Sequence, residues 1–249
     1  MNKKRIVTGV GVVLLITGIV GSIWSGIEVM PKLINDAQAM QNNLNQQEIL
    51  YKGQIDLAKL NINSKVSNII IKKYDGKDVI VERSGNKNLS TITTKESGSE
   101  LTIDEEFNNN NSNLGKSIDD IVRYLVDELY TSHNSDITVY IPENIDINVN
   151  TNNGGLYIDG VNANNLNFNT QYGNISLSEN SNIKTLNIKS NSDISLKVRE
   201  VYCIDNLSIE SNYVNIYEGT FVEDESKIPE SIKILAQGGY DNIIPLWRI

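Results

Sequence analysis

Few residues in this sequence have the type and spacing that chemistry requires. His133 is the only histidine, so one chain holds neither a two-histidine metal site nor a second base for a nucleophilic triad. Cys203 is the only cysteine, and no cation or histidine lies beside it in the sequence to activate its thiol. We interpret His133 as a solvated loop residue and Cys203 as a small core or corner residue.

Two further patterns resemble chemical motifs. Ser181 and Lys184 have the Ser-x-x-Lys spacing of penicillin-recognising enzymes, but that pair needs a helix turn, and here it precedes a strand-like segment. The acidic runs 104–106 and 223–225 lack the alternating oxygen ligands of a calcium loop, so we interpret both as solvated charge. The sequence therefore predicts no catalytic, cofactor-binding or metal-binding residue, and no cofactor.

The charge balance excludes one class of partner. The chain carries 31 acidic residues against 22 Lys and Arg, for a net charge of -9 over 249 residues. Such a surface repels phosphate and does not release its counterions, so nucleic acid is excluded as a partner.

The N-terminal residues predict a membrane anchor. Lys3, Lys4 and Arg5 precede an uncharged apolar run over residues 6–27, which at about 1.5 Å per residue spans a hydrocarbon core of about 30 Å. Basic residues before such a run place the N-terminus in the cytoplasm. A cleaved signal peptide is the alternative, but the small-x-small site at 37–39 lies well beyond the run. We expect a cytoplasmic tail 1–5, a single transmembrane helix 6–27, a stalk helix or linker 28–54 and an extracytoplasmic domain 55–249.

The rest of the chain repeats a short pattern of alternating apolar and polar residues, which indicates strands with one buried face. A first strand recurs at steps of 19, 20 and 21 residues and a second strand at steps of 19, 19 and 20. An early copy lies at 60–71. The first strands begin at Ile147, Leu166, Leu186 and Leu207, and the second strands at Leu156, Ile175, Ile194 and Val214.

This period predicts an all-β chain, a single-sheet-stack β-solenoid of ~20-residue repeats whose coils stack about 4.8 Å apart. The hydroxyl residues Thr151, Thr170, Ser190 and Ser211 should turn inward at the corner that follows each first strand. Strand-like runs at 77–84, 90–95 and 100–104 interrupt the array. They are followed by an insertion, 105–135, with an amphipathic helix over 117–130 that we expect to cover an edge.

Several strings carry a resemblance to a known family. They are Leu60-Asn-Ile-Asn-Ser64, Ile137-Thr-Val-Tyr-Ile-Pro142, Thr151-Asn-Asn-Gly-Gly-Leu156 and Thr170-Gln-Tyr-Gly-Asn-Ile175. Over about residues 55–249 the chain resembles the bacterial putative-adhesin family of β-strand-repeat, or toastrack, domains of unknown function. The resemblance implies a domain tethered outside the cytoplasmic membrane, in some members encoded beside envelope-stress systems, and it supplies no functional residues. One departure is that the corner glycine of the first repeats becomes Asp193.

Three functions remain open from the sequence. The first is a non-enzymatic interaction or scaffold protein, or an envelope-stress accessory protein, anchored in the cell membrane and facing outward. The others are a polysaccharide-active β-solenoid and a secreted carbohydrate-binding module. An enzyme needs convergent carboxylates, and the outward rows contain none, so we expect no enzymatic activity. The outward row of the first strands is a candidate interaction strip for an unknown envelope protein or a glycan, and consists of Asn148, Asn167, Asn187 and Ser208.

Overall fold

The computed structural model describes residues 47–85, 90–107, 135–142, 144–217 and 229–241. They belong to Gln46–Ile249, one of two units into which the chain divides, the other being Met1–Asn45. Several predictions from the sequence fall outside the described residues. They concern the tail, the transmembrane helix, the stalk up to residue 46, the 117–130 helix and His133. Within the described ranges, no helix combines the length and the apolar character that crossing a bilayer requires.

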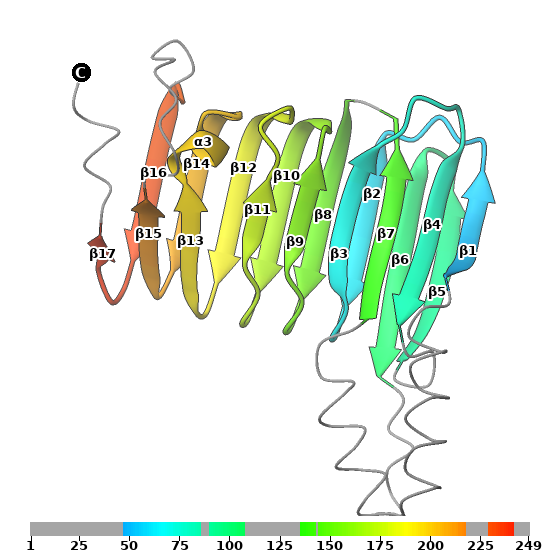
Figure 1. Ribbon diagram of the computed structural model, residues 1–249, viewed down its shortest axis with the longest axis horizontal. Helices are drawn as coiled ribbons and strands as arrows, with labels where there is room; N and C mark the ends of the chain where they lie inside the picture. The colour runs from blue at the N-terminus through cyan, green and yellow to red at the C-terminus, as the bar shows by residue number, and fades with distance from the viewer. Residues whose placement is uncertain (1–46, 86–89, 108–134, 143, 218–228, 242–249) are drawn as a thin grey trace, which may run out of the picture. The chain divides into compact units, whose positions relative to one another are not determined.

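Most of the fold is built from coils. Each coil places one strand in an eight-stranded sheet and the next strand on the opposite face (Figure 1). The eight-stranded sheet consists, in spatial order, of β16 (Ser231–Ala236), β14 (Ile204–Ser211), β12 (Asn182–Ser190), β10 (Asn162–Thr170), β8 (Ile145–Thr151), β2 (Lys59–Ser64), β6 (Glu100–Phe107) and β5 (Ser90–Ser97).

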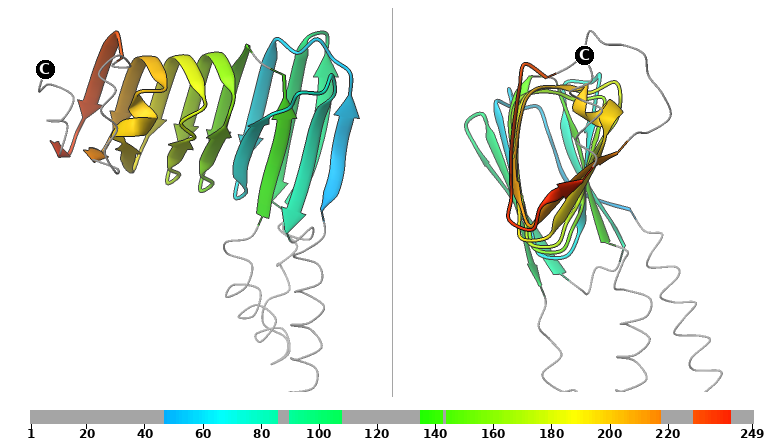
Figure 2. Two further views of the ribbon diagram at one scale, coloured as in Figure 1. Left: turned by 45° about the horizontal axis from the view of Figure 1, so that its top comes forward. Right: turned by 90° about the vertical axis from the view of Figure 1, so that its left-hand side faces the viewer.

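The opposite face contains two sheets. The six-stranded sheet consists of β1 (Glu48–Gly53), β4 (Val79–Gly85), β7 (Ser135–Ile141), β3 (Asn68–Lys73), β9 (Leu156–Asp159) and β11 (Ile175–Leu177). The three-stranded sheet consists of β13 (Asp193–Lys197), β15 (Tyr213–Tyr217) and β17 (Tyr240–Asp241), and a short helix, α3 (Val198–Val201), connects β13 to β14. The antiparallel pairs that β4 makes with β1 and β7 and that β5 makes with β6 depart from the coil pattern. Viewed along the stack, the coils superpose around a common interior (Figure 2). The predicted all-β repeat architecture is confirmed.

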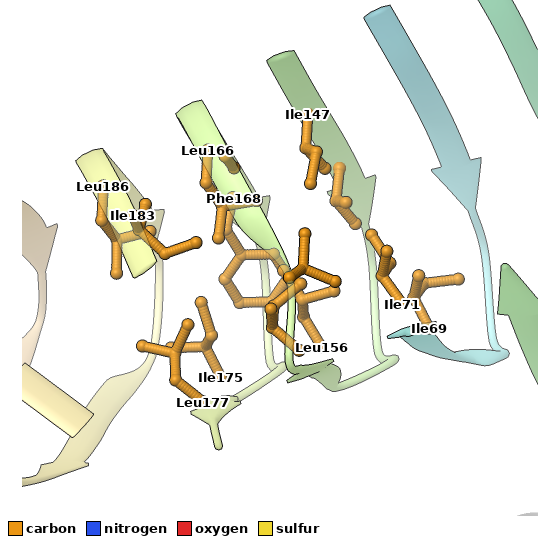
Figure 3. Packing of buried hydrophobic residues seen from close by; sticks show 14 of the residues in the cluster. Ile69, Ile71, Ile147, Leu156, Leu166, Phe168, Ile175, Leu177, Ile183 and Leu186 are labelled. Atoms are coloured by element: carbon orange, nitrogen blue, oxygen red, sulfur yellow. The ribbon is translucent and has the colours of Figure 1, made fainter. Parts of the chain in front are cut away.

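The interior is filled by stacks of apolar side chains in register. Leu166 of β10 aligns with Ile147 of β8 and with Leu186 of β12. All three side chains are fully buried, as is the bulky Phe168. Labelled side chains from both faces point into this shared interior in Figure 3. The inward assignment is confirmed, because parallel in-register strands place every second side chain of successive coils in one buried column.

The early copy lies beside the contiguous repeats, although a long segment separates them in sequence. Strand β2 pairs in parallel with β8 on one side and with β6 on the other. The intervening strands β4 to β7 therefore build one end of the array. β1, which precedes the expected domain start at residue 55, pairs with β4 at that end. There the Tyr51 hydroxyl donates to Glu96 Oε2 of β5 at 2.6 Å and so joins the two faces.

Two corner glycines allow the coils to stack closely. A Cβ atom at Gly154 would overlap the carbonyl oxygen of Ser67 in the neighbouring coil, and one at Gly173 would overlap the carbonyl oxygen of Gly154. The next corner has no glycine: Asp193 follows Ser190 by three residues, as Gly173 follows Thr170, but it is Ser192 N that donates to the corner hydroxyl. There the opposite face is divided, because the six-stranded sheet ends at β11 and the three-stranded sheet begins at β13. The loss of the glycine in the sequence thus coincides with a change of corner geometry.

Candidate functional site

The candidate interaction strip forms a continuous hydrogen-bonded ladder. Asn187 Nδ2 donates to Asn167 Oδ1 at 2.9 Å, Asn167 donates to Asn148 at 2.7 Å, and Asn148 donates to Asn61 at 2.8 Å. We call these four asparagines the first amide ladder. Asn61 of the early copy extends the predicted strip, and Ser208 lies in register beside Asn187 at the other end. In-register parallel strands produce such ladders because they repeat one side chain at strand spacing.

A second amide ladder runs beside the first, two residues further along each strand. Asn169 donates to Asn150 at 2.9 Å, and Asn150 donates to Asn63 at 2.9 Å. The row continues into an ion pair, in which Lys189 Nζ lies 3.2 Å from Glu210 Oε1. Since side chains at i and i+2 share one face of a strand, the two ladders together give the eight-stranded sheet a broad amide surface.

Both ladders have the same polarity and end on carboxylates. Every amide donates toward the β6 end of the sheet, where Asn63 donates to Asp104 Oδ1 at 2.6 Å and Asn61 donates to Glu100 Oε1. A carboxylate is an acceptor-only group, and its charge strengthens the terminal hydrogen bond. The carboxylates thus satisfy the donors at the β6 end of each row.

A groove follows the corner alongside the second amide ladder. The corner hydroxyl residues point inward, so the residues immediately before and after them project on either side of a shallow depression. Thr151 and Thr170 are buried there and accept hydrogen bonds from Gly154 N and Gly173 N at 2.9 and 2.6 Å. We call this depression, of about 410 Å³, the corner groove; its lining consists of Asn63, Ser64, Lys65, Asn150, Thr151, Asn152, Asn169, Thr170, Gln171, Lys189 and Asn191.

The corner groove continues into a second hollow toward the β6 end. This hollow has a volume of about 580 Å³ and shares Lys65 and Asn152 with the corner groove. Its far side is formed by Glu106 and Phe107, and the Phe107 side chain is 47% exposed. The two depressions adjoin at these shared residues, and Phe107 lines the one nearer the β6 end.

Glu105 occupies the corner position of its coil, where the neighbouring coil has Ser64. The register of β2 and β6 pairs Asn63 with Asp104, so the next residues, Ser64 and Glu105, are equivalent. Glu105 is only 2% exposed. Its Oε2 accepts hydrogen bonds from Ser64 Oγ at 2.6 Å and from three successive backbone N–H groups, those of residues 65, 66 and 67, at 3.0, 3.2 and 3.1 Å. Three converging N–H groups form an anion-binding nest.

Hydroxyl groups surround the other carboxylate oxygen of Glu105. Oε1 accepts hydrogen bonds from Ser67 Oγ at 2.5 Å and from Ser90 Oγ at 2.6 Å. Ser67 Oγ also lies 2.8 Å from Ser135 Oγ, and Arg83 donates to Ser90 Oγ at 3.2 Å. This buried cluster connects β4, β5, β6 and β7 with the turn that follows β2.

The cluster determines the charge of Glu105. Burial raises the pKa of its carboxyl group, but hydrogen bonds from Ser64, Ser67 and Ser90 outweigh burial and lower the pKa to about 2. Glu105 is therefore an ionised group inside the fold, and the prediction that the 104–106 run is solvated charge is wrong for this residue. The sequence did contain a signal for this position. Leu101 and Ile103 match Leu60 and Ile62 of the early copy, and this alignment places Glu105 at the corner that Ser64 occupies.

The remaining sequence candidates do not assemble into a reactive site. Cys203 is buried, as predicted, with Sγ 3.5 Å from the carbonyl oxygen of Arg199. Ser181 is buried and accepts a hydrogen bond from Gly160 N, whereas Lys184 is exposed on β12. Among the described residues there is no group of three or more His, Cys, Asp or Glu side chains arranged to hold a metal ion.

Exposed tyrosines on the repeats could contact a sugar ring. Tyr172 is 70% exposed at a corner turn and Tyr157 is 40% exposed on β9, while Tyr213 is half-buried at the start of β15. The lining of the corner groove contains none of them. The amide row predicted from the sequence is present, and the aromatic residue that lines the adjoining hollow is Phe107.

Known proteins are similar to this chain to different degrees. A crystal structure of a protein from Clostridium sporogenes, described as a putative cell adhesion protein, is 15% identical with a TM-score of 0.45, and the match covers 78% of this chain and 95% of that one. For a protein from Bacteroides fragilis, described as a putative adhesin, the identity is 11%, the TM-score 0.29, and the coverage 80% and 97%. Comparison with curated proteins finds no match. The family model described as Toastrack DUF4097 matches residues 57–244. Since this match spans well over half of the sequence, the chain belongs to the Toastrack DUF4097 family, as its resemblance predicted.

Proposed function

We propose that this chain is a non-enzymatic interaction protein of the bacterial cell envelope. Residues 6–27 anchor it in the cytoplasmic membrane, and the β-repeat domain faces outward, where it binds or holds an envelope component. The observation that carries the proposal is the amide surface formed by the two ladders. An exposed, ordered and nearly neutral array of this kind suits recognition of a polar partner better than it suits chemistry.

The described carboxylates favour binding over catalysis. A glycosidase needs a carboxyl group whose pKa is raised so that it can protonate a leaving group. Glu105 has a lowered pKa and is enclosed by donors. On the amide surface, Glu100 and Asp104 accept hydrogen bonds from the ladder ends, and Glu210 pairs with Lys189. Each of these groups has a structural partner, which supports an interaction role.

Membrane placement is tested by fractionating cells that produce the full-length tagged chain and sequencing the N-terminus of the membrane-bound protein. We expect an intact chain that external protease degrades only after the outer face of the membrane is exposed. A mature chain that begins near Met40 would instead identify a secreted domain.

The binding role is tested with the variant Asn148→Thr, Asn167→Thr, Asn187→Thr, which keeps β propensity and removes the exposed amides. After chemical cross-linking in whole cells, we expect recovery of envelope components to decrease in this variant. Circular dichroism and the melting temperature establish that the variant is folded. Unchanged recovery by a folded variant would place the binding surface elsewhere.

A further inference from the structure

The amide ladders keep half of their hydrogen-bonding capacity. A primary amide has two N–H donors and two acceptor lone pairs. Inside a ladder, Asn148, Asn150 and Asn167 each use one N–H and one lone pair along the row. Each of these amides therefore retains one donor and one acceptor, and this pair repeats once per coil, at a spacing of about 4.8 Å.

The second wall of the corner groove adds a further row of amides. Asn152, Gln171 and Asn191 each follow the corner residue of their coil, and all three line the groove. Because they lie after the corner, they stand outside both ladders. A ligand in the groove would thus contact the second amide ladder on one side and these three side chains on the other.

The small number of charged side chains in the groove favours an uncharged, polar ligand. The lining of the groove contains two lysines and no acidic residue, and one of the lysines, Lys189, is paired with Glu210. The remaining lining side chains are amides and hydroxyls. The adjoining hollow at Phe107 adds one carboxylate, Glu106. A polyanion would find few cations there, and an apolar ligand would leave the amides without partners at a cost in free energy.

The direction of the groove favours a polymeric ligand whose length per unit is close to the strand spacing. The groove crosses successive coils, so a chain lying in it would meet an equivalent set of groups at each strand spacing of about 4.8 Å. An extended peptide advances about 3.3 Å per residue and is normally recognised by pairing with a sheet edge. A β-linked sugar chain in its extended form advances by nearly the strand spacing per sugar, and its hydroxyls both donate and accept.

We propose that the corner groove binds a neutral, extended, β-linked polysaccharide that lies along the stacking axis, with one sugar facing each coil. At the β6 end, the exposed ring of Phe107 provides an apolar face against which a sugar ring packs. The inference rests on the proposed interaction function and specifies the ligand class and its position.

The test uses the full-length chain in detergent micelles and a fluorescently labelled hexamer of β-1,4-linked N-acetylglucosamine. The groove variant is Asn152→Ala, Gln171→Ala, Asn191→Ala. Its matched control, Asn182→Ala with Lys184→Ala, removes exposed polar side chains from β12 outside the groove. We expect the hexamer to bind, its affinity to decrease at least about tenfold in the groove variant, and the control to match the wild type. All three proteins should have similar melting temperatures.

Two comparator ligands separate this inference from the proposed function. The hexamer of α-1,4-linked glucose, which coils, and an extended neutral peptide of similar length should both bind weakly. Equal affinity of the groove variant and wild type for the β-linked hexamer would refute the inference, as would preferential binding of the peptide. If the hexamer does not bind while envelope components are still captured through the ladder residues, the glycan assignment fails and the interaction function stands.

Discussion

Ser64 donates a hydrogen bond from Oγ to Oε2 of Glu105 at 2.6 Å, and the two residues hold equivalent corner positions in adjacent coils. At the other corners, a hydroxyl group makes hydrogen bonds within its own turn, as Thr151 does with Gly154 N. In the β6 coil the longer carboxylate reaches across to the next coil and accepts the N–H groups of that turn. Glu105 thus ties the coil of β6 and β7 to the body of the array.

Removing the charge of Glu105 should be costly. Glu105→Gln replaces one acceptor oxygen by a donor amide inside the cluster of Ser67 and Ser90 hydroxyls, and it removes a negative charge near Arg83. We expect the free energy of unfolding to decrease by about 3–5 kcal/mol, as for one partner of a buried charged network. Denaturant unfolding measures the change. Glu106→Gln, at the adjacent exposed position, is the control and should change it by less than about 0.5 kcal/mol.

The same carboxylate predicts a specific loss of stability in acid. Its pKa is lowered from 4.5 to about 2 in the fold, so its stabilising contribution is complete above pH 4.5 and is lost as the pH falls toward 2. The amount is roughly 2–3 kcal/mol. Melting curves recorded between pH 2 and pH 6 should show the wild type and Glu105→Gln converging in stability as the pH decreases. A constant difference over this range would contradict the assigned titration.

The adjacent glycines Gly154 and Gly155 should differ sharply in their tolerance of alanine. A Cβ at Gly154 overlaps the Ser67 carbonyl oxygen, whereas a Cβ at Gly155 would lie 3.4 Å from the Asn174 carbonyl oxygen, an ordinary contact. We expect Gly154→Ala to destabilise the fold by about 1–3 kcal/mol or more, since backbone must shift, and Gly155→Ala to have little effect. Thermal unfolding of the two variants tests this, and equal melting temperatures would argue against the close stacking of these coils.

A carboxylate inside the first amide ladder should disrupt it. Asn167→Asp removes the donor to Asn148 and places a charged oxygen against that residue's Oδ1, so two acceptors face each other. We expect a loss of about 1–3 kcal/mol in the free energy of unfolding. Asn182→Asp makes the same chemical change at an exposed site on β12 outside both ladders and should cost far less. If the two variants are equally stable, the ladder contributes nothing measurable.

Strand identity and facing could be predicted from the sequence because alternation fixes which side chains are buried. Ile147, Leu166 and Leu186 recur at the repeat period, and burial of one predicts burial of all. The spatial order of the coils could not be predicted in the same way. That β2 lies between β6 and β8 depends on pairing between segments far apart in sequence, for which the local pattern carries no information.

The amide surface and the corner residues were predicted only in part, because they too depend on which strands are neighbours. The amide row followed from the repeat, but its extension through Asn61 required the neighbour of β8 to be known. The corner groove also follows from alternation, once the corner hydroxyls are inward. Glu105 was missed because an acidic run is ordinarily solvated, although the match of Leu101 and Ile103 to Leu60 and Ile62 places it at a corner position.

The spatial position of β2 has a consequence for how the chain folds. Neighbouring residues of the ladders in β8, β10 and β12 are 19 or 20 positions apart, whereas Asn148 and Asn61 are 87 positions apart. Closing the longer loop costs more chain entropy and slows contact formation. The C-terminal coils should therefore assemble first and serve as a template. Pairing of β2 with β8 should follow, although β2 is synthesised first, and its contact with β6, only 41 positions away at Asn63 and Asp104, can form independently.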